Sequence, residues 1–333
     1  MENTNLITGR SNIKLAEKIS THLGIRLTGC KITDYHNTEI SVEILENIRG
    51  KSVYILQTGC FNDSHSINDY FMEFELIVNA CKLSSAESIT ALIPYFPYSR
   101  ADKKDLPRTS LGAALITSKI KNVGVDRIVS MDLHSGQIQG FTDLPFDNLY
   151  SIKYLMNFLK LNYFDMKEHS KNDFILVSPD SGGIRRVISY AEVLGMRHII
   201  MYKQRDYTQV SKITKTIIIG DNSDLTGKTA IIIDDIIDTM GTMVAASNEL
   251  VQHGIKNIIV LATHGIFSGN AIERINSSEI ITDVIVTNTL PQEENMKKCP
   301  KIKEVDISDL FSEVIKRLEL GGSIYELFRF DEI

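Results

Sequence analysis

Three carboxylates follow one apolar run in the stretch "AIIIDDIIDTMGT". Asp234 and Asp235 come directly after four apolar residues, and Asp238 follows shortly afterwards. Carboxylate oxygens accept hydrogen bonds from sugar hydroxyls and are also the ligands that Mg²⁺ prefers. Exposed acids that simply cap a strand end would not need to be so concentrated. We therefore expect a binding function at this point of the chain.

The residues after the acids are of the kind that binds phosphate. Thr239, Met240, Gly241 and Thr242 lead into an apolar segment that predicts a helix beginning near Met243. A helix N-terminus offers unpaired N–H groups and the positive end of the helix dipole. Glycine lets the backbone approach a ligand closely. Carboxylates that bind hydroxyl groups, next to a helix N-terminus that binds phosphate, are typical of a sugar-phosphate site.

A second candidate is "VSPDSGGIRR", which follows another apolar run. Gly182 and Gly183 permit a tight turn whose N–H groups could hold an anion. Asp180 is a possible metal ligand, and Arg185 and Arg186 could add charge-assisted bonds to phosphate. The alternative is a plain strand-to-helix turn.

His134, in "MDLHSGQIQGF", also follows an apolar run. A lone histidine is usually structural, but ligands of open α/β sheets bind beyond the carboxyl ends of strands, which favours a functional role. In "YFPYSRADKKD", Arg100, Lys103 and Lys104 could meet a polyphosphate, or they could form a solvated charged loop. In "MYKQRDYTQ", Lys203 and Arg205 follow a strand without strong apolar anchors, as in a mobile lid.

The stretch "GDNSDLTGKT" is similar to a phosphate-binding P-loop but does not match its pattern. The P-loop pattern needs glycine at position 222, where this chain has Asn222, and it must follow a strand and open a helix. Gly227-Lys228-Thr229 instead precedes a strand, which indicates an ordinary turn.

Short apolar runs without polar alternation recur along the chain and predict strands covered on both faces, as in a parallel sheet. They lie at residues 53–56, 89–93, 127–133, 174–177, 199–202, 230–233, 258–262 and 284–286. Helical spacing appears between them at 111–123, 187–194 and 244–253, each followed by glycine. Strands alternating with helices predict an α/β fold with right-handed crossovers.

The length of 333 residues favours two domains, 1–150 and 151–333, each a largely parallel sheet flanked by helices. The net charge of −6 disfavours nucleic acid as a partner. No apolar run is long enough for a membrane span or a signal peptide, so we expect a cytoplasmic protein. The four cysteines form no C-x-x-C pair, which argues against zinc or redox chemistry and favours reduced thiols.

Taken together, these stretches resemble the ribose-phosphate pyrophosphokinase family, also called phosphoribosyl pyrophosphate synthetase. The resemblance rests on the acid-rich loop and on "MDLHSGQIQGF", "SPDSGG", "YFPYSRADKKD", "THGIFSG" and "VTNTLPQE", in the family's order, and the last two are closest to eukaryotic members. It implies two phosphoribosyltransferase-type domains. It also implies transfer of the β,γ-diphosphoryl group of ATP to the C1 hydroxyl of ribose 5-phosphate, with Mg²⁺ as cofactor and a homo-oligomer, a hexamer built from dimers.

The resemblance also implies roles for particular residues. Ribose 5-phosphate would be held by Asp234, Asp235, Asp238, Thr239, Met240, Gly241 and Thr242. ATP would contact Tyr35, Asn37, Glu39, Arg100 and Asp105, and the diphosphate loop would be Asp180, Ser181, Gly182 and Gly183. His134 and Asp180 would bind Mg²⁺, and Lys203, Arg205 and His134 would be catalytic.

The chain departs from the family pattern at several positions. Tyr35 replaces the usual Phe, Ala101 replaces a Gln beside Arg100, and Met240 replaces a smaller residue. Asn47 replaces a common Ser beside Arg49, in a region that contributes to the family's regulatory phosphate and ADP site. These departures leave open how the chain contacts the nucleotide and whether it has the family's allosteric control.

Two alternatives belong to other functional classes. Some eukaryotes have a non-catalytic subunit associated with the synthetase, but such subunits typically lose the loop at 238–242 and carry an insertion after the lid strand. Here the loop is present and Lys203 and Arg205 stand without an insertion. A phosphoribosyltransferase would explain the acid-rich loop but not the ATP-side stretches.

Overall fold

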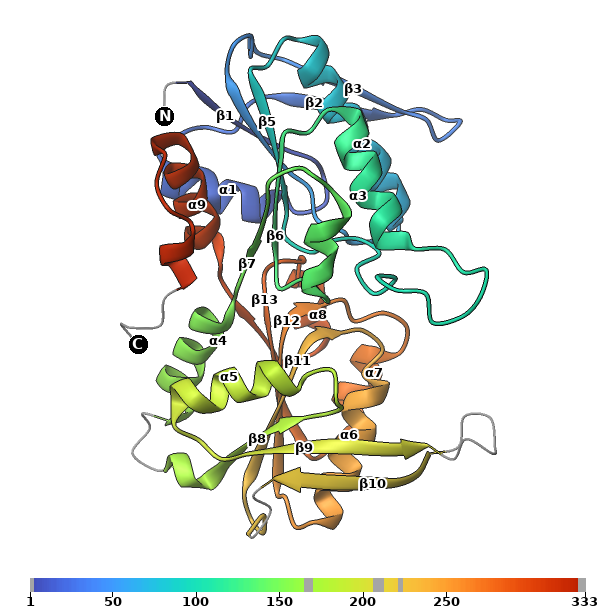
Figure 1. Ribbon diagram of the computed structural model, residues 1–333, viewed down its shortest axis with the longest axis vertical. Coiled ribbons are helices and arrows are strands. Elements are labelled where there is room, and N and C mark those ends of the chain that lie inside the picture. Colours follow the sequence, from blue (N-terminus) through green and yellow to red (C-terminus); the bar gives the residue numbers. More distant parts are fainter. Residues whose placement is uncertain (1–2, 165–169, 206–212, 221–223, 329–333) are drawn as a thin grey trace. The chain divides into compact units, whose positions relative to one another are not determined.

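The computed structural model describes residues 3–164, 170–205, 213–220 and 224–328 (Figure 1). The chain divides into two compact units. The first comprises the described residues up to Tyr150, together with Thr289–Pro291 and the described part of Asp306–Arg329. The second comprises the described parts of Ser151–Asn288 and Gln292–Val305.

The first unit contains a five-stranded sheet in the order β1-β4-β5-β6-β7, in which every pairing is parallel. Its strands are β1 (Thr4–Thr8), β4 (Ser52–Leu56), β5 (Ser88–Ile93), β6 (Arg127–Met131) and β7 (Phe146–Leu149). Its helices are α1 (Ile13–Leu23), α2 (Ile67–Leu83), α3 (Gly112–Val123) and α9 (Ser308–Leu320), with 3-10 turns η1 (Gly136–Phe141) and η4 (Tyr325–Phe328). In Figure 1, α2 and α3 cover one face of this sheet, and α1 and α9 lie on the other.

A separate hairpin of two antiparallel strands belongs to the same unit. It consists of β2 (Cys30–Asp34) and β3 (Ile40–Ile44), with Asp34 paired to Ile40 at the end next to the turn. Ile32 and Val42 on its inner face pack partly buried against the core beneath α2. Polar residues alternate with these apolar ones, so the continuous apolar runs of the sequence did not reveal this hairpin.

The second unit contains a seven-stranded sheet in the order β10-β9-β8-β11-β12-β13-β14. Its strands are β8 (Phe174–Ser178), β9 (His198–Arg205), β10 (Ile213–Gly220), β11 (Thr229–Ile237), β12 (Asn257–Gly265), β13 (Ile281–Thr287) and β14 (Ile302–Val305). Only the edge strand β10 is antiparallel to its neighbour.

Helices cover both faces of this second sheet. They are α4 (Ile152–Leu159), α5 (Ile184–Leu194), α6 (Gly241–Gln252), α7 (Ala271–Ser277) and α8 (Glu293–Lys298), with short helical turns η2 (Lys160–Phe164) and η3 (Lys171–Asp173). One core lies beneath α6 and α7, and a second lies beneath α4 and α5. Burial on both faces explains why the strands read as continuous apolar runs, and it confirms the predicted α/β class with largely parallel sheets.

The strand that carries the acids is longer than its apolar run predicts. β11 continues through Asp234 and Asp235 to Ile237, because β12 runs beside it up to Gly265. Its pairing with β8 ends earlier, at Ile232. The two acids therefore lie inside β11 and beyond the end of β8, rather than after the end of their own strand.

The final helix belongs to the first unit, whereas the sequence divides the chain simply at residue 150. α9 packs against α1, and Glu319 near its end accepts hydrogen bonds from the Tyr54 hydroxyl at 2.8 Å and the Thr4 hydroxyl at 2.9 Å. These contacts join residues more than 250 positions apart, and local sequence patterns carry no information about such pairings.

Two further features concern the P-loop and the membrane span that the sequence argues against. Gly227 adopts a positive φ of 77° in the turn that precedes β11, and no helix follows it directly, so the GKT stretch is not a P-loop. Among the described helices, none is long and apolar enough to cross a membrane.

Candidate active site

Asp234 and Asp235 form a buried acidic pair. The Asp234 side chain is 19% exposed and that of Asp235 is 7% exposed. Burial, followed by the neighbouring negative charge of Asp235, raises the pKa of Asp234 well above its usual range. Arg186 opposes this effect, because its Nη1 lies 3.5 Å from Asp234 Oδ1 and 3.4 Å from Asp235 Oδ1. The pair therefore favours partners that can donate or share a proton, as hydroxyl groups do.

The loop after β11 turns sharply into α6. Met240 adopts the left-handed conformation, with φ 63° and ψ 0°, and α6 begins at the next residue, Gly241. The Met240 side chain is 2% exposed and packs in the core with Phe267. The unusual methionine therefore points into the protein interior and leaves the loop surface to backbone and threonine groups. The helix begins two residues earlier than the sequence predicts.

Two residues from the next loop and helix brace this turn. The Ser268 hydroxyl donates to Asp238 Oδ1, and Arg274 Nη1 on α7 donates to the carbonyl oxygen of Thr239 at 2.6 Å. A Cβ added to Gly241 would lie 3.4 Å from Arg274 Nη1, so the guanidinium lies directly beside the loop. Sequence reasoning gave neither residue a role, although Ser268 lies in the quoted stretch "THGIFSG".

The loop after β8 folds onto its own carboxylate. Asp180 Oδ1 accepts hydrogen bonds from the N–H groups of Gly182 at 2.8 Å and Gly183 at 3.3 Å. Ser181 is exposed at the tip. Gly183 lies tightly against the strand ends, because an added Cβ would be 2.8 Å from Ser178 Oγ and 3.6 Å from the Ile233 carbonyl oxygen. The tight turn is therefore present, and its two glycine amides donate to the Asp180 side chain, while anion binding at this loop stays a prediction.

Arg186 lies beside the acidic pair. Both arginines of "SGGIRR" are candidates for phosphate binding in the sequence, and in the structure Arg186 contacts Asp234 and Asp235 while Arg185 is exposed. The start of α5 follows β8, which is the neighbour of β11, so the fold brings Arg186 to the acids. Nothing in the spacing of the sequence indicates this pairing.

Lys203 and Arg205 lie at the end of β9, on the far side of β8 from β11. Their backbone pairs with β10, where Lys203 is opposite Thr216 and Arg205 is opposite Ile213. Their side chains, and residues 206–209 of the predicted lid, lie outside what the structure describes. Their catalytic role stays a prediction.

In the first unit, the loops after β5 and β6 are tied together. His134 is exposed in the loop after β6, and Arg100 and Asp105 are exposed in the loop after β5. Between these loops, the Gln137 side-chain amide donates to the buried Asp102 carboxylate at 2.9 Å. Sequence reasoning did not identify this link.

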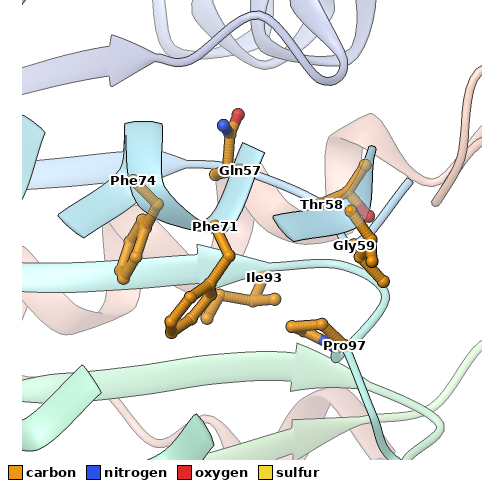
Figure 2. Close-up of a pocket in the computed structure, with 8 residues that line it drawn as sticks. Gln57, Thr58, Gly59, Phe71, Phe74, Ile93 and Pro97 are labelled. Atoms are coloured by element: carbon orange, nitrogen blue, oxygen red, sulfur yellow. The ribbon is translucent and has the colours of Figure 1, made fainter. Parts of the chain in front are cut away.

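The loop after β4 fixes the start of the Arg100 loop. Gly59 N–H donates to the Tyr95 carbonyl oxygen at 2.9 Å, and Tyr95 N–H donates to the Thr58 hydroxyl oxygen at 3.0 Å. A Cβ on Gly59 would lie 3.0 Å from the Tyr95 carbonyl oxygen and 3.1 Å from Pro97. Figure 2 shows Gly59 and Pro97 close together beyond the strands, next to a small apolar pocket that Phe71, Phe74 and Ile93 also line.

The three residues predicted to contact adenine lie in the turn between β2 and β3. Tyr35, Asn37 and Glu39 are all exposed, and Tyr35 is 54% exposed. Tyr35 N–H donates to the Glu39 carbonyl oxygen at 2.9 Å, and Glu39 N–H donates to Asn37 Oδ1 at 3.3 Å. An exposed ring on a closed turn is suited to stacking against a planar base.

The first residues of the stretch "THGIFSG" lie in the sheet. Thr263 and His264 lie inside β12 and are 2% and 1% exposed, not in a loop beyond it. Thr263 is bonded within the unit, since its carbonyl oxygen accepts from the Thr287 hydroxyl at 2.8 Å and its own hydroxyl contacts Ser151 Oγ at 2.8 Å.

Comparison with known proteins gives this arrangement a family. A family model described as the N-terminal domain of ribose phosphate pyrophosphokinase matches residues 4–124, and one described as a phosphoribosyl synthetase-associated domain matches residues 210–329. The crystal structure of phosphoribosylpyrophosphate synthetase from Mycobacterium smegmatis is 36% identical, with a TM-score of 0.85, and the match covers 96% of this chain and 100% of that one. The chain belongs to the ribose phosphate pyrophosphokinase family. Membership confirms the resemblance seen in the sequence.

More distant matches fall among phosphoribosyltransferases. Adenine phosphoribosyltransferase from Thermoanaerobacter pseudethanolicus is 22% identical over 41% of this chain and 77% of its own, with a TM-score of 0.29. The enzyme from Trypanosoma brucei is 18% identical over 43% of this chain and 67% of its own, with a TM-score of 0.32. At these TM-scores the two likenesses add nothing to the pyrophosphokinase assignment.

Proposed function

We propose that this pyrophosphokinase transfers the β,γ-diphosphoryl group of ATP to the C1 hydroxyl of ribose 5-phosphate. The hydroxyl oxygen forms a bond to the β-phosphorus and loses its proton. The bond from the β-phosphorus to the α,β-bridging oxygen breaks, and AMP leaves with that oxygen. The observation that carries the proposal is the 36% identity to a synthetase over 96% of this chain.

The second unit supplies the proposed sugar site. Asp234 and Asp235 accept hydrogen bonds from the ribose hydroxyls, and their location on β11 fixes them directly before the phosphate loop. Residues 238–242 receive the 5-phosphate at the start of α6, where unpaired N–H groups and the helix dipole favour an anion. The loop is supported from outside by Ser268 and Arg274, so it is held ready before the substrate arrives.

The nucleotide side is proposed from the first unit and from β9. Tyr35, Asn37 and Glu39 take the base, and Arg100 and Asp105 contact the remainder of ATP. Lys203 and Arg205 stabilise the charge that develops on the transferred group. Phosphoryl transfer depends mainly on positioning and charge stabilisation, which these residue types provide.

Mg²⁺ is part of the proposal, with His134 and Asp180 as protein ligands. Among the described residues there is no cluster of three or more metal-ligating side chains. The Asp180 carboxylate fits Mg²⁺, because this ion usually keeps several waters and binds through one or two carboxylates and the substrate phosphates. Bound Mg²⁺ would neutralise charge on the transferred phosphates. Asp180, whose Oδ1 accepts from the Gly182 and Gly183 amides, would hold the ion next to the proposed diphosphate loop.

Several further properties are proposed from family membership. These are a homo-oligomer of dimers assembled into a hexamer, and location in the cytoplasm. The alternative of a non-catalytic associated subunit is not favoured, because residues 238–242 keep the full loop and lead into an intact helix.

The activity assay is direct. The purified chain is incubated with ATP, Mg²⁺ and ribose 5-phosphate, and AMP formation is followed together with ³¹P signals of the sugar product. We expect one AMP for each sugar consumed and none when ribose replaces ribose 5-phosphate. The absence of sugar-dependent AMP would overturn the proposal.

A further inference from the structure

The first unit contains a fully buried carboxylate. Glu73 on α2 is 0% exposed, and such a charge is strongly destabilising unless it is paired and hydrogen-bonded. Here Arg10 supplies two partners, since its backbone N–H lies 2.6 Å from Glu73 Oε1 and its Nε lies 2.7 Å from Oε2. Gln57 Nε2 donates a third bond to Oε1 at 3.0 Å. The position of Arg10 is therefore fixed from the protein interior.

Gln57 and Gly9 pack against the contact between Arg10 and Glu73. In Figure 2 the Gln57 amide points away from the rings of Phe71 and Phe74. Its Oε1 accepts from the Ser11 hydroxyl at 2.7 Å, and its Nε2 donates to the Tyr70 carbonyl oxygen at 2.8 Å. Gly9 is pressed against the same groups, because an added Cβ would lie 2.2 Å from Gln57 Oε1 and 2.7 Å from Glu73 Oε1. Position 9 therefore has no space for a side chain.

The other end of Arg10 reaches the hairpin. Its Nη1 donates to Asp34 Oδ2 at 2.5 Å and its Nη2 donates to Asp34 Oδ1 at 2.8 Å, a two-bond pair of planar groups. Asp34 is the last residue of β2, directly before Tyr35. His65 Nε2 lies 3.4 Å from the same carboxylate. The chain from Glu73 through Arg10 to Asp34 thus links a buried helix position to the base of the exposed turn.

A two-stranded hairpin is marginally stable by itself, so its tip depends on such contacts. The strands contact the core through partly buried Ile32 and Val42, but every residue of the turn at 35–39 is exposed. The geometry points to Arg10 as a positioning residue that orients the Tyr35–Glu39 turn for the base of a purine nucleotide. This inference rests on the proposed nucleotide-binding role of that turn.

The test uses Asp34→Asn as its main variant. This change removes the negative charge that pairs with Arg10 outside the core and leaves the buried Arg10–Glu73 pair intact. Arg10→Lys is the second variant, since one ammonium group cannot make both the two-bond pair with Asp34 and the bond to Glu73. Arg26→Lys is the matched control. Arg26 pairs with Glu46 at 2.8 Å in the same unit and is itself 80% exposed.

We expect Asp34→Asn and Arg10→Lys to raise KM for ATP by roughly three- to tenfold, with KM for ribose 5-phosphate changed less than about twofold. Hydrogen exchange at the bonded amides of Tyr35 and Thr38 should become faster in both variants and not in Arg26→Lys. Unchanged exchange and unchanged KM for ATP would overturn the inference. Faster exchange with unchanged KM would also overturn it, since the turn would then be held but not used.

Failure of the proposed function can be distinguished from failure of this inference about Arg10. It would appear as wild-type protein without sugar-dependent AMP, whatever the variants do. In that case hydrogen exchange and equilibrium binding of ATP still decide whether Arg10 orients the turn. Tyr35→Ala without effect on ATP binding would overturn the role of the turn and therefore of Arg10.

Discussion

Arg274 Nη1 donates a hydrogen bond to the carbonyl oxygen of Thr239, so α7 holds the loop that opens α6. Arg274→Met removes this bond while keeping a long apolar stem. We expect KM for ribose 5-phosphate to rise about tenfold, the equivalent of one charge-assisted hydrogen bond of roughly 1.4 kcal/mol. KM for ATP should stay unchanged, because the proposed role of the loop is to bind the sugar phosphate. Steady-state kinetics with each substrate varied in turn measures both values.

Glu273→Gln, at an exposed position on the same helix, is the control for Arg274→Met. It should leave both KM values at the wild-type level. Equal increases for both substrates in Arg274→Met would show a general loss of structure instead of a local effect on the loop.

Asp234→Asn is expected to abolish activity and to raise thermal stability at neutral pH. The folded-state pKa of Asp234 is raised above its ordinary value of 3.8, chiefly by burial and by Asp235. Its contribution to stability is therefore fully present below about pH 3.8 and is lost as pH rises through the folded-state pKa. Asparagine carries no charge, so the gain in melting temperature over wild type should grow with increasing pH. Calorimetry from pH 4 to 8 measures this trend.

The exposed variant Asp63→Asn serves as the control for this titration. Its melting temperature should follow the wild-type pH dependence. A melting temperature of Asp234→Asn that falls further below wild type as pH rises would contradict the predicted sign.

Gly9→Ala should destabilise the protein strongly. Its Cβ would lie 2.2 Å from Gln57 Oε1, and Gln57 cannot turn aside without breaking its bonds to Ser11, Tyr70 and Glu73. Overpacking of a filled site costs about 1–3 kcal/mol, and the broken bonds add to that loss. Chemical denaturation measures the change. Gly140→Ala, where an added Cβ meets nothing within 4 Å, should remain close to wild type.

Lys203→Ala should lower turnover by about 10²- to 10³-fold, the loss typical of one group that stabilises transition-state charge. Binding of ribose 5-phosphate should stay near normal, because the proposed sugar site lies on β11 and at the start of α6. Lys256→Ala is the control, since Lys256 is exposed just before β12, at the strand end opposite the proposed site. Single-turnover kinetics and equilibrium sugar binding separate the two effects. Wild-type turnover in Lys203→Ala would remove this residue from the mechanism.

The sequence predicts the buried parts of this fold because burial leaves a local pattern. Strands such as β8 and β12 are covered on both faces, so their apolar runs are continuous and easily recognised. The β2–β3 hairpin alternates polar and apolar residues over short lengths, and it was missed. The length of β11 was underestimated because its last residues are held by β12, which a reading of one strand at a time does not include.

Sequence reasoning proposed residues for the candidate site but did not predict the contacts among them. Asp234, Asp235 and Gly241 were proposed because chemistry restricts the residue types that can bind a sugar phosphate, and their roles stay predictions. The Arg186 contact to the acids and the support from Ser268 and Arg274 depend on which strands are neighbours in the sheet. Met240 shows the same limit, since only its backbone conformation directs its side chain into the core.

The return of α9 to the first unit has a consequence for biosynthesis. The first unit lacks the helix that packs on α1, and the carboxylate of Glu319, until nearly the whole chain has been translated. At about 5–20 residues per second, the ribosome needs on the order of 10–30 s to proceed from the end of β7 to α9. During that interval α9 is absent and the face of α1 that it covers stays exposed. A nascent chain of this protein therefore presents an apolar surface that holding chaperones would bind.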